Sequence, residues 1–337
     1  MGTQAVFLVD KISDDFRMVY PESTKKAISA CFGLPGLPII CSDDIDSYVE
    51  ECREAEAIFS TWNMPVLSSD EIRKRFPSLK HVFYAAGTVK YFAGPYLDLG
   101  IRVHSAASVN AQPVAQYATA QILLAAKGFY RSRITPLRHF FRMKKAADSF
   151  PGNYRAKIGI LGFGNIGQRV ANALRSQADV SILAYDPYVS PKAFEGLGVS
   201  KATLREVFSS CDVISNHMPD IPETKGVISA ELFAEMKPTA TFINTGRGAQ
   251  VDEAALASTL KRNPLQTALL DVTFPEPIRP WNALLRCGNA YVTPHIAGSL
   301  GEEKARMGEA MLEELRLVVG GSAPLYEVDS ASFERSA

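Results

Sequence analysis

Residues 157–186, KIGILGFGNIGQRVANALRSQADVSILAYD, decide the fold expected for this chain. An apolar run at 157–161 leads into the glycine pattern GxGxxG at 162–167 and then into a helix-like stretch. A second apolar run ends in Asp186, and 186 − 167 = 19 residues separate that acid from the last glycine. Such glycines alone are common in turns. Strand, turn, helix and acid in this order predict a βαβ unit that binds a dinucleotide.

Each glycine of this turn has a distinct physical role. Gly162 permits a tight turn, Gly164 lets the backbone approach a pyrophosphate without a Cβ clash, and Gly167 lets helix and strand pack closely. Asn165 and Ile166 follow at the start of the helix, where free N–H groups attract phosphate. These five residues are therefore expected to bind the cofactor.

The carboxylate of Asp186 indicates which dinucleotide binds. It can accept hydrogen bonds from the ribose 2′- and 3′-hydroxyls, and it would repel a 2′-phosphate. No arginine follows it, because the next residues are Pro187, Tyr188 and Val189. We therefore predict NAD rather than NADP. The alternative is a glycine-rich packing turn followed by a surface aspartate.

Two series of short apolar runs predict two parallel sheets covered by helices, so the fold class is α/β. The expected strands are 5–10, 57–61, 81–86 and 102–107, then 157–161, 180–185, 212–217, 239–244, 266–271 and 290–294. The expected helices are 45–56, 69–75, 114–128 (with Pro113 at the first turn), 166–176, 204–209, 230–236, 252–262 and 302–319. Residues 133–154 are expected to form an irregular connection, and the last helix to pack on the N-terminal domain.

The composition excludes several classes of protein. Lys and Arg total 36 and Asp and Glu total 36, so there is no basic excess to neutralise a nucleic-acid backbone. No segment reaches the ~20 apolar residues that cross a bilayer, and residues 1–10 lack the features of a secretory signal. Five cysteines without a CxxC pair and five scattered histidines predict reduced thiols, a cytoplasmic protein and no metal site. One local basic run is typical of a solvated helix face: Arg131, Arg133, Arg138, Arg142, Lys144 and Lys145.

Polar residues follow three successive strands of the second series, at the edge where open α/β sheets place ligands. Arg247 follows the run 239–244. Asp271 ends the next run, and Glu276 lies five residues further on. His295 follows the last run. One such residue alone is usually structural, but three at neighbouring strand ends predict an acid–base site in the crevice.

Five motifs lie between Lys157 and Ser299: GFGNIG, HMPDIPETKGVI, MKPTATFINTGRGAQVDEAAL, DVTFPEP and TPHIAG. With them the chain resembles the D-isomer-specific 2-hydroxyacid dehydrogenase family, which contains glyoxylate/hydroxypyruvate reductases, D-lactate dehydrogenases and phosphoglycerate dehydrogenases. The resemblance extends from about Tyr84 to about Val328 and is dense from Lys157 to Ser299.

This resemblance implies two doubly wound parallel-sheet domains. An NAD-binding Rossmann domain, 109–297, would be inserted into a flavodoxin-like substrate domain made of 1–108 and 298–337. It also implies a homodimer and a small 2-keto or D-2-hydroxy acid as the substrate.

The resemblance further implies a role for each polar residue. His295 would supply the proton to the substrate oxygen, and Glu276 would orient the imidazole and stabilise its charged form. Arg247 would bind the substrate carboxylate and carbonyl. The remaining expected site residues are Asp271 at the nicotinamide carboxamide, Ala86 and Gly87 at the substrate carboxylate, and Asn110, Thr245 and His217 along the cofactor.

Two questions stay open from the sequence. Phe140, Phe141 and Trp281 are candidates for substrate specificity, with core or interface packing as the alternative. The alternative function is an NAD(H)-responsive binding protein like the transcriptional co-repressors of this family, since such proteins can keep the Arg, Glu and His.

Overall fold

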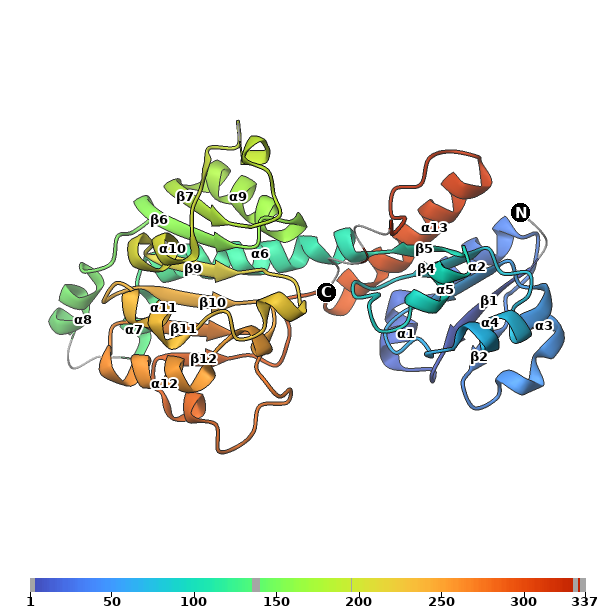
Figure 1. Cartoon of the computed structure of the whole chain (residues 1–337), viewed down its shortest axis with the longest axis horizontal. Helices are drawn as coiled ribbons and strands as arrows, with labels where there is room; N and C mark the ends of the chain where they lie inside the picture. Colours follow the sequence, from blue (N-terminus) through green and yellow to red (C-terminus); the bar gives the residue numbers. More distant parts are fainter. Residues whose placement is uncertain (1–3, 135–139, 195, 330–332, 334–337) are drawn as a thin grey trace. The chain divides into compact units, whose positions relative to one another are not determined.

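A computed structural model describes residues 4–134, 140–194, 196–329 and 333 of the chain (Figure 1). The chain divides into two compact units, Met1–Asn110 with Ser299–Ala337, and Ala111–Gly298. These limits lie one or two residues from the boundaries expected at 108 and 298. The function of each unit stays a prediction at this point.

The first unit contains a five-stranded parallel sheet in the order β2-β1-β3-β4-β5. Its strands are β1 Ala5–Val9, β2 Ile39–Cys41, β3 Ala57–Ser60, β4 His81–Tyr84 and β5 Arg102–Ser105. Four of them confirm expected runs. The sequence did not predict β2, because its three residues are too few to show a pattern beside the prolines at 35 and 38.

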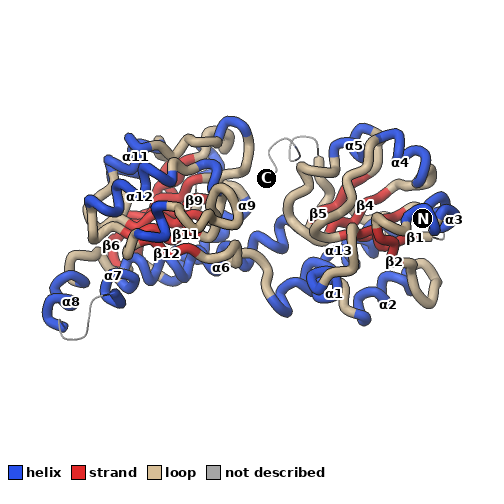
Figure 2. The backbone as a smooth tube through the Cα atoms, turned by 90° about the horizontal axis from the view of Figure 1, so that it is seen from below, coloured by secondary structure: helices blue, strands red, loops and turns tan. Residues whose placement is uncertain are grey.

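Helices cover both faces of this sheet, as Figure 2 shows. They are α1 Asp14–Val19, α2 Glu22–Cys31, α3 Val49–Glu54, α4 Ser69–Arg75, α5 Gly94–Asp98 and α13 Ala305–Val319, with short 3₁₀ turns η1 Ile45–Ser47 and η7 Gly301–Lys304. The helix expected over 45–56 is thus broken into η1 and α3. The last helix does pack on this unit: Met307, Met311 and Leu315 join a buried cluster with Phe7 and Phe83.

The second unit contains a seven-stranded parallel sheet in the order β12-β11-β10-β9-β6-β7-β8. Its strands are β6 Tyr154–Leu161, β7 Asp179–Tyr185, β8 Val199–Lys201, β9 Val213–Asn216, β10 Thr241–Asn244, β11 Thr267–Leu270 and β12 Ala290–Val292. The order reverses between β6 and β9. A crevice for ligands opens at the carboxyl ends of strands where such a reversal occurs.

The helices of this unit lie on both faces of its sheet. They are α6 Ala107–Ala126, which begins in the first unit, α7 Phe129–Ile134, α8 Phe140–Ala147, α9 Asn165–Gln177, α10 Leu204–Ser210, α11 Ala230–Glu235 and α12 Glu253–Arg262. Short 3₁₀ turns complete it: η3 Pro191–Phe194, η4 Pro222–Thr224, η5 Gly248–Gln250 and η6 Ala283–Arg286. One buried cluster joins α6 and α9 to Ile158 and Ile160, and another joins α10, α11 and α12 to Ile214 and Phe242. This layering confirms the doubly wound α/β fold.

Two expectations about the segment between the sheets were wrong. Helix α6 starts at Ala107 rather than near Pro113, because the Ser105 hydroxyl accepts the Ala107 N–H at 3.2 Å and the helix continues through the proline. The connection expected at 133–154 contains helix α8, where Lys144 and Lys145 are exposed. Arg138 of the basic run lies outside the described residues.

Candidate active site

The glycine turn between β6 and α9 has the geometry that its sequence predicts. Gly162 has φ +84°, and a Cβ there would lie 2.7 Å from the carbonyl oxygen of His217. A Cβ at Gly167 would lie 2.2 Å from the carbonyl oxygen of Gly162. At Gly164 a Cβ would meet nothing within 4 Å. Packing of the chain therefore explains two of the glycines, whereas the third faces open space.

That open space lies at the N-terminus of α9. Gly164 is the N-cap residue and supplies no side-chain cap, so the helix end that begins with Asn165 and Ile166 presents its dipole to the space beside the turn. Asn165 contributes its side-chain oxygen to Arg169, whose Nε donates at 2.8 Å. A helix N-terminus beside open space suits a pyrophosphate, so these residues fit a dinucleotide.

Asp186 lies at the end of β7 and its carboxylate faces the turn. One oxygen accepts the N–H of Phe163 at 2.8 Å, and the other accepts the N–H groups of Tyr188 and Val189 at 2.9 and 3.1 Å. The side chain is thus fixed next to Gly162 and Gly164 with acceptor capacity remaining. Its placement fits a ribose diol beyond the glycine turn.

His217 and Thr245 meet at the ends of β9 and β10. The His217 Nδ1 lies 2.9 Å from the Thr245 hydroxyl, and its Nε2 lies 3.0 Å from the Ser215 hydroxyl. Burial lowers the pKa of His217 to about 3, so the ring is neutral at ordinary pH. It can take part in hydrogen bonds along a bound cofactor, but it carries no charge there.

Arg247 follows β10 at the start of η5. Its Nη1 donates to the carbonyl of Gly246 at 2.8 Å, and its own backbone N–H donates to the side chain of Gln250 at 3.1 Å. Gln250 is fully buried and also accepts from Asn216 at 2.7 Å. This buried amide network was not predicted from the sequence. Its signal was two asparagines at the ends of apolar strand runs, Asn216 and Asn244.

Close packing joins the loop of Arg247 to the loop of Glu276. A Cβ at Gly248 would lie 2.0 Å from the carbonyl carbon of Thr273, so the two backbones touch. Thr273 in turn donates its N–H to the Glu276 carboxylate at 3.4 Å. The ends of β10 and β11 therefore bring the arginine loop against the loop that carries the glutamate.

The third loop adds the histidine. The Nδ1 of His295 lies 2.8 Å from Glu276 Oε2, and the two side chains are 51% and 39% exposed. The expected imidazole–carboxylate couple therefore exists, and its ring is accessible. An ionised carboxylate accepts, so Nδ1–H donates to it and Nε2 is left to face a reactant.

Asp271 fixes the backbone that carries His295. One carboxylate oxygen accepts the Thr293 hydroxyl and the Ile296 N–H at 2.6 and 2.8 Å, and the other accepts the Ala297 N–H at 2.8 Å. His295 has φ +55°, in the left-handed region that a residue with a Cβ disfavours. The hydrogen bonds of Asp271 hold the loop in that conformation.

The remaining expected residues lie in the first unit or on exposed parts of the second. In the first unit, the carbonyls of Ala86 and Gly87 both accept the Ser105 hydroxyl, at 3.0 and 2.9 Å. Asn110 accepts the N–H of Ser299 at 2.9 Å in the same unit. Phe140, Phe141 and Trp281 are 58%, 85% and 66% exposed, so none packs in a core of the chain.

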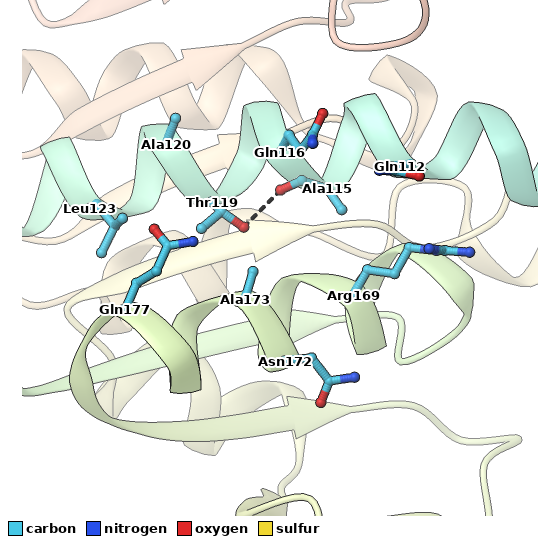
Figure 3. Close-up of a pocket in the computed structure, with 10 residues that line it drawn as sticks. All are labelled: Gln112, Ala115, Gln116, Thr119, Ala120, Leu123, Arg169, Asn172, Ala173 and Gln177. Atoms are coloured by element: carbon cyan, nitrogen blue, oxygen red, sulfur yellow. Dashed lines mark hydrogen bonds between the residues drawn. The ribbon is translucent and has the colours of Figure 1, made fainter. Parts of the chain in front are cut away.

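A groove of about 590 Å³ lies between α6 and α9 (Figure 3). Its walls carry amide side chains and small alanines, with Arg169 as the charged residue. None of the expected catalytic residues lines it. In the described parts of the chain no group of His, Cys, Asp and Glu could hold a metal ion. Nor does that part of the chain contain a helix long and apolar enough to cross a membrane.

The fold and the glycine turn together define an α/β protein with a dinucleotide-binding unit. The chain belongs to the D-isomer specific 2-hydroxyacid dehydrogenase family: the model of that family's NAD binding domain matches residues 120–297, more than half of the chain. Both the resemblance seen in the motifs and NAD as the cofactor are confirmed at the level of the family.

Individual relatives agree with this assignment. The D-3-phosphoglycerate dehydrogenase of Mycobacterium tuberculosis is 34% identical over 224 residues, which cover 66% of this chain and 41% of that protein. The match thus spans about two fifths of the length of this relative.

Solved structures show the fold over nearly the whole chain. The D-mandelate dehydrogenase of Rhodotorula graminis has a TM-score of 0.76 at 20% identity, covering 98% of this chain and 99% of that one. The D-lactate dehydrogenase of Lactobacillus jensenii with NAD+ has a TM-score of 0.71 at 21% identity, covering 97% and 100%.

Proposed function

We propose that this protein transfers a hydride between NAD(H) and a small D-2-hydroxy acid or 2-keto acid, of the glyoxylate or hydroxypyruvate kind. The observation that carries the proposal is the exposed pair of His295 and Glu276, 2.8 Å apart, in the unit that also holds the glycine turn. NAD(H), when bound, supplies or accepts the hydride. The chain itself must then handle one proton and one carboxylate.

His295 handles the proton. In the direction of reduction, Nε2–H of the charged ring gives its proton to the substrate oxygen, and in oxidation the neutral ring takes it back. The Glu276 carboxylate holds Nδ1–H and stabilises the charged ring. The pair therefore acts as one acid–base unit.

Arg247 handles the charge of the substrate. A guanidinium can donate two parallel hydrogen bonds to a carboxylate and can polarise an adjacent carbonyl. We propose the backbone N–H groups of Ala86 and Gly87 as a second site for the carboxylate, which makes the first unit the substrate domain and the second the NAD domain.

The residues proposed to bind the cofactor are those whose positions fit a dinucleotide. The N-terminus of α9, with Gly162, Gly164 and Gly167, would hold the pyrophosphate, and Asp186 the ribose hydroxyls. His217, Thr245, Asp271 and Asn110 would lie along the rest of the cofactor. A cytoplasmic location is part of the same proposal and is supported by free thiols at all five cysteines. A homodimer is also part of it and is supported by the resemblance to the family.

A panel of 2-keto acids tested with NADH and with NADPH checks this function. We expect oxidation of NADH with at least one short-chain acid and a slower reaction with NADPH. Tight NADH binding without turnover on any acid would instead favour an NAD(H)-responsive binding protein.

A further inference from the structure

The loop after β11 carries Glu276 but has little apolar packing of its own. Residues 273–282 read TFPEPIRPWN, and two of the large side chains are turned outward: Phe274 is 67% exposed and Trp281 is 66% exposed. Burial therefore contributes little to holding this loop. Polar contacts must fix the position of the glutamate.

Glu253 provides two such contacts from outside the loop. Its Oε1 accepts the backbone N–H of Phe274 at 2.7 Å, and its Oε2 accepts the side-chain amide of Asn282 at 2.7 Å. Phe274 and Asn282 are the two ends of the segment that contains Glu276. One carboxylate thus holds both ends of the loop, and charged acceptors make the stronger hydrogen bonds.

We call Glu253 with its hydrogen bonds to Phe274 and Asn282 the clasp. Both Glu253 and Asn282 belong to anchored elements of the fold. Glu253 is the first residue of α12, a helix capped by Asp252 and buried against the sheet through Leu256 and Leu260. Asn282 caps η6, because its side-chain oxygen accepts the N–H of Leu284 at 2.9 Å. The clasp therefore connects the exposed loop to two anchored elements.

We infer that Glu253 is a positioning residue: through Phe274 and Asn282 it fixes the loop so that Glu276 meets the imidazole of His295. This inference rests on the proposed function for its catalytic consequence. The mechanical part, that Glu253 restrains the loop, does not depend on any activity.

Trp281 makes the mechanical part measurable. The chain has two tryptophans, Trp62 and Trp281. In a Trp62→Phe background, the fluorescence anisotropy and acrylamide quenching of Trp281 report the freedom of the loop in the protein without cofactor. We expect Glu253→Ala to lower the anisotropy and to raise the quenching rate.

Two variants serve as graded tests and one as a matched control. Glu253→Gln keeps an acceptor for the Phe274 N–H but loses one for Asn282, so its effect should be intermediate. Asn282→Ala removes the contact with Glu253 Oε2, together with the cap of η6, but keeps the bond to Phe274, and it remains informative if Glu253→Ala fails to fold. Glu231→Ala is the control, because Glu231 also stands in the first turn of a helix, α11, and bonds Ser229 there.

The catalytic part is tested by rate and by a double-mutant cycle. Misplacing Glu276 should lower kcat about 10- to 100-fold, the scale of effect expected from a displaced catalytic group, while the Kd for NADH changes little. Glu276→Gln should cost less in the Glu253→Ala background than in the wild type.

Each result decides a separate point. Unchanged Trp281 anisotropy in Glu253→Ala would overturn the inference. A freer loop with unchanged kcat would overturn the positioning of Glu276. If the wild type reduces no acid, the proposed function fails, whereas the anisotropy still tests the clasp.

Discussion

Two histidine–glutamate pairs in the described part of the chain have nearly the same length in opposite surroundings. His104 and Glu314 lie 2.7 Å apart in the first unit with both side chains 0% exposed, whereas His295 and Glu276 lie 2.8 Å apart and are 51% and 39% exposed. The distance between the partners therefore does not distinguish a structural pair from a chemical one. The two pairs differ in whether Nε2 of the histidine, the ring nitrogen that does not face the glutamate, can reach a reactant.

In the buried pair every ring nitrogen is already engaged. The Glu314 carboxylate accepts the N–H groups of Leu325 and Tyr326, at 2.8 and 2.9 Å, besides Nδ1 of His104. Nε2 of His104 lies 3.1 Å from Nδ1 of His81. Burial lowers the pKa of His104, so the neutral ring donates to Glu314 and accepts from His81. This relay fastens the C-terminal segment to β4 and β5.

The largest effect is expected from breaking the buried pair. Glu314→Ala would leave the His104 ring and two backbone N–H groups without their acceptor, which should cost about 3–5 kcal/mol of unfolding free energy. Denaturant unfolding in a Trp281→Phe background, followed by Trp62 of the first unit, measures it. The neighbouring Glu313→Ala is the control, because Glu313 is 56% exposed and pairs only loosely with Arg316. Equal losses in both variants would contradict the structural role.

Breaking the exposed pair should affect turnover instead. His295→Ala removes the proposed acid–base group, so turnover should fall about 100-fold or more while the Kd for NADH stays within a few-fold. Steady-state kinetics together with NADH fluorescence titration measure the two quantities. Stability should barely change, because the side chain is half exposed. A near-normal rate would reject the assignment of His295.

The glycine turn offers a sharper version of the same contrast. Asp186 accepts structural hydrogen bonds there and, in the proposed function, also binds the ribose of the cofactor. Asp186→Ala should weaken NADH binding about tenfold and narrow the preference for NADH over NADPH, since the 2′-phosphate is no longer repelled. It also removes the acceptor of Phe163, Tyr188 and Val189. Isothermal titration with both cofactors measures the effect, with the exposed Asp179→Ala as the control. An unchanged preference would mean that another group contacts the ribose.

The most gradual effect is a dependence of stability on pH. Burial lowers the pKa of His81 from 6.5 to about 4, so between these pH values the unfolded chain binds a proton that the folded chain does not. The contribution of His81 is complete above pH 6.5 and is lost as the pH falls towards 4, by at most about 1.4 kcal/mol per pH unit. Tm measured across this range should fall less steeply in His81→Gln, whose amide can still donate to His104. Parallel curves would exclude His81 as the titrating group.

The sequence predicted the parts of the molecule that depend on neighbours in the chain. Glycines at 162, 164 and 167 and the acid at 186 lie within one βαβ unit, so their spacing carries the geometry. The ends of β10, β11 and β12 could be placed because parallel strands share one carboxyl edge. Short edge strands β2 and β8 carry too few residues to show a pattern.

Contacts between residues far apart in the chain could not be predicted from the sequence. His104 and Glu314 are 210 positions apart, and nothing in either local sequence indicates the pairing. Glu253 reads as an ordinary acid at a helix start, which it also is, so its bonds to Phe274 and Asn282 could not be foreseen. Helix α6 passes through Pro113 because its start is set by Ser105, eight residues earlier, rather than by the proline.

A hydrogen bond between Asn110 and Ser299 joins the two points at which the second unit is inserted into the first. Asn110 is the last residue of the first unit before the insertion and Ser299 the first after it, and a bond of 2.9 Å joins them. The backbone therefore leaves the first unit and returns to it at neighbouring positions. Because the two ends of the inserted segment adjoin, its length or sequence can change while the strand order of the sheet in the first unit stays the same.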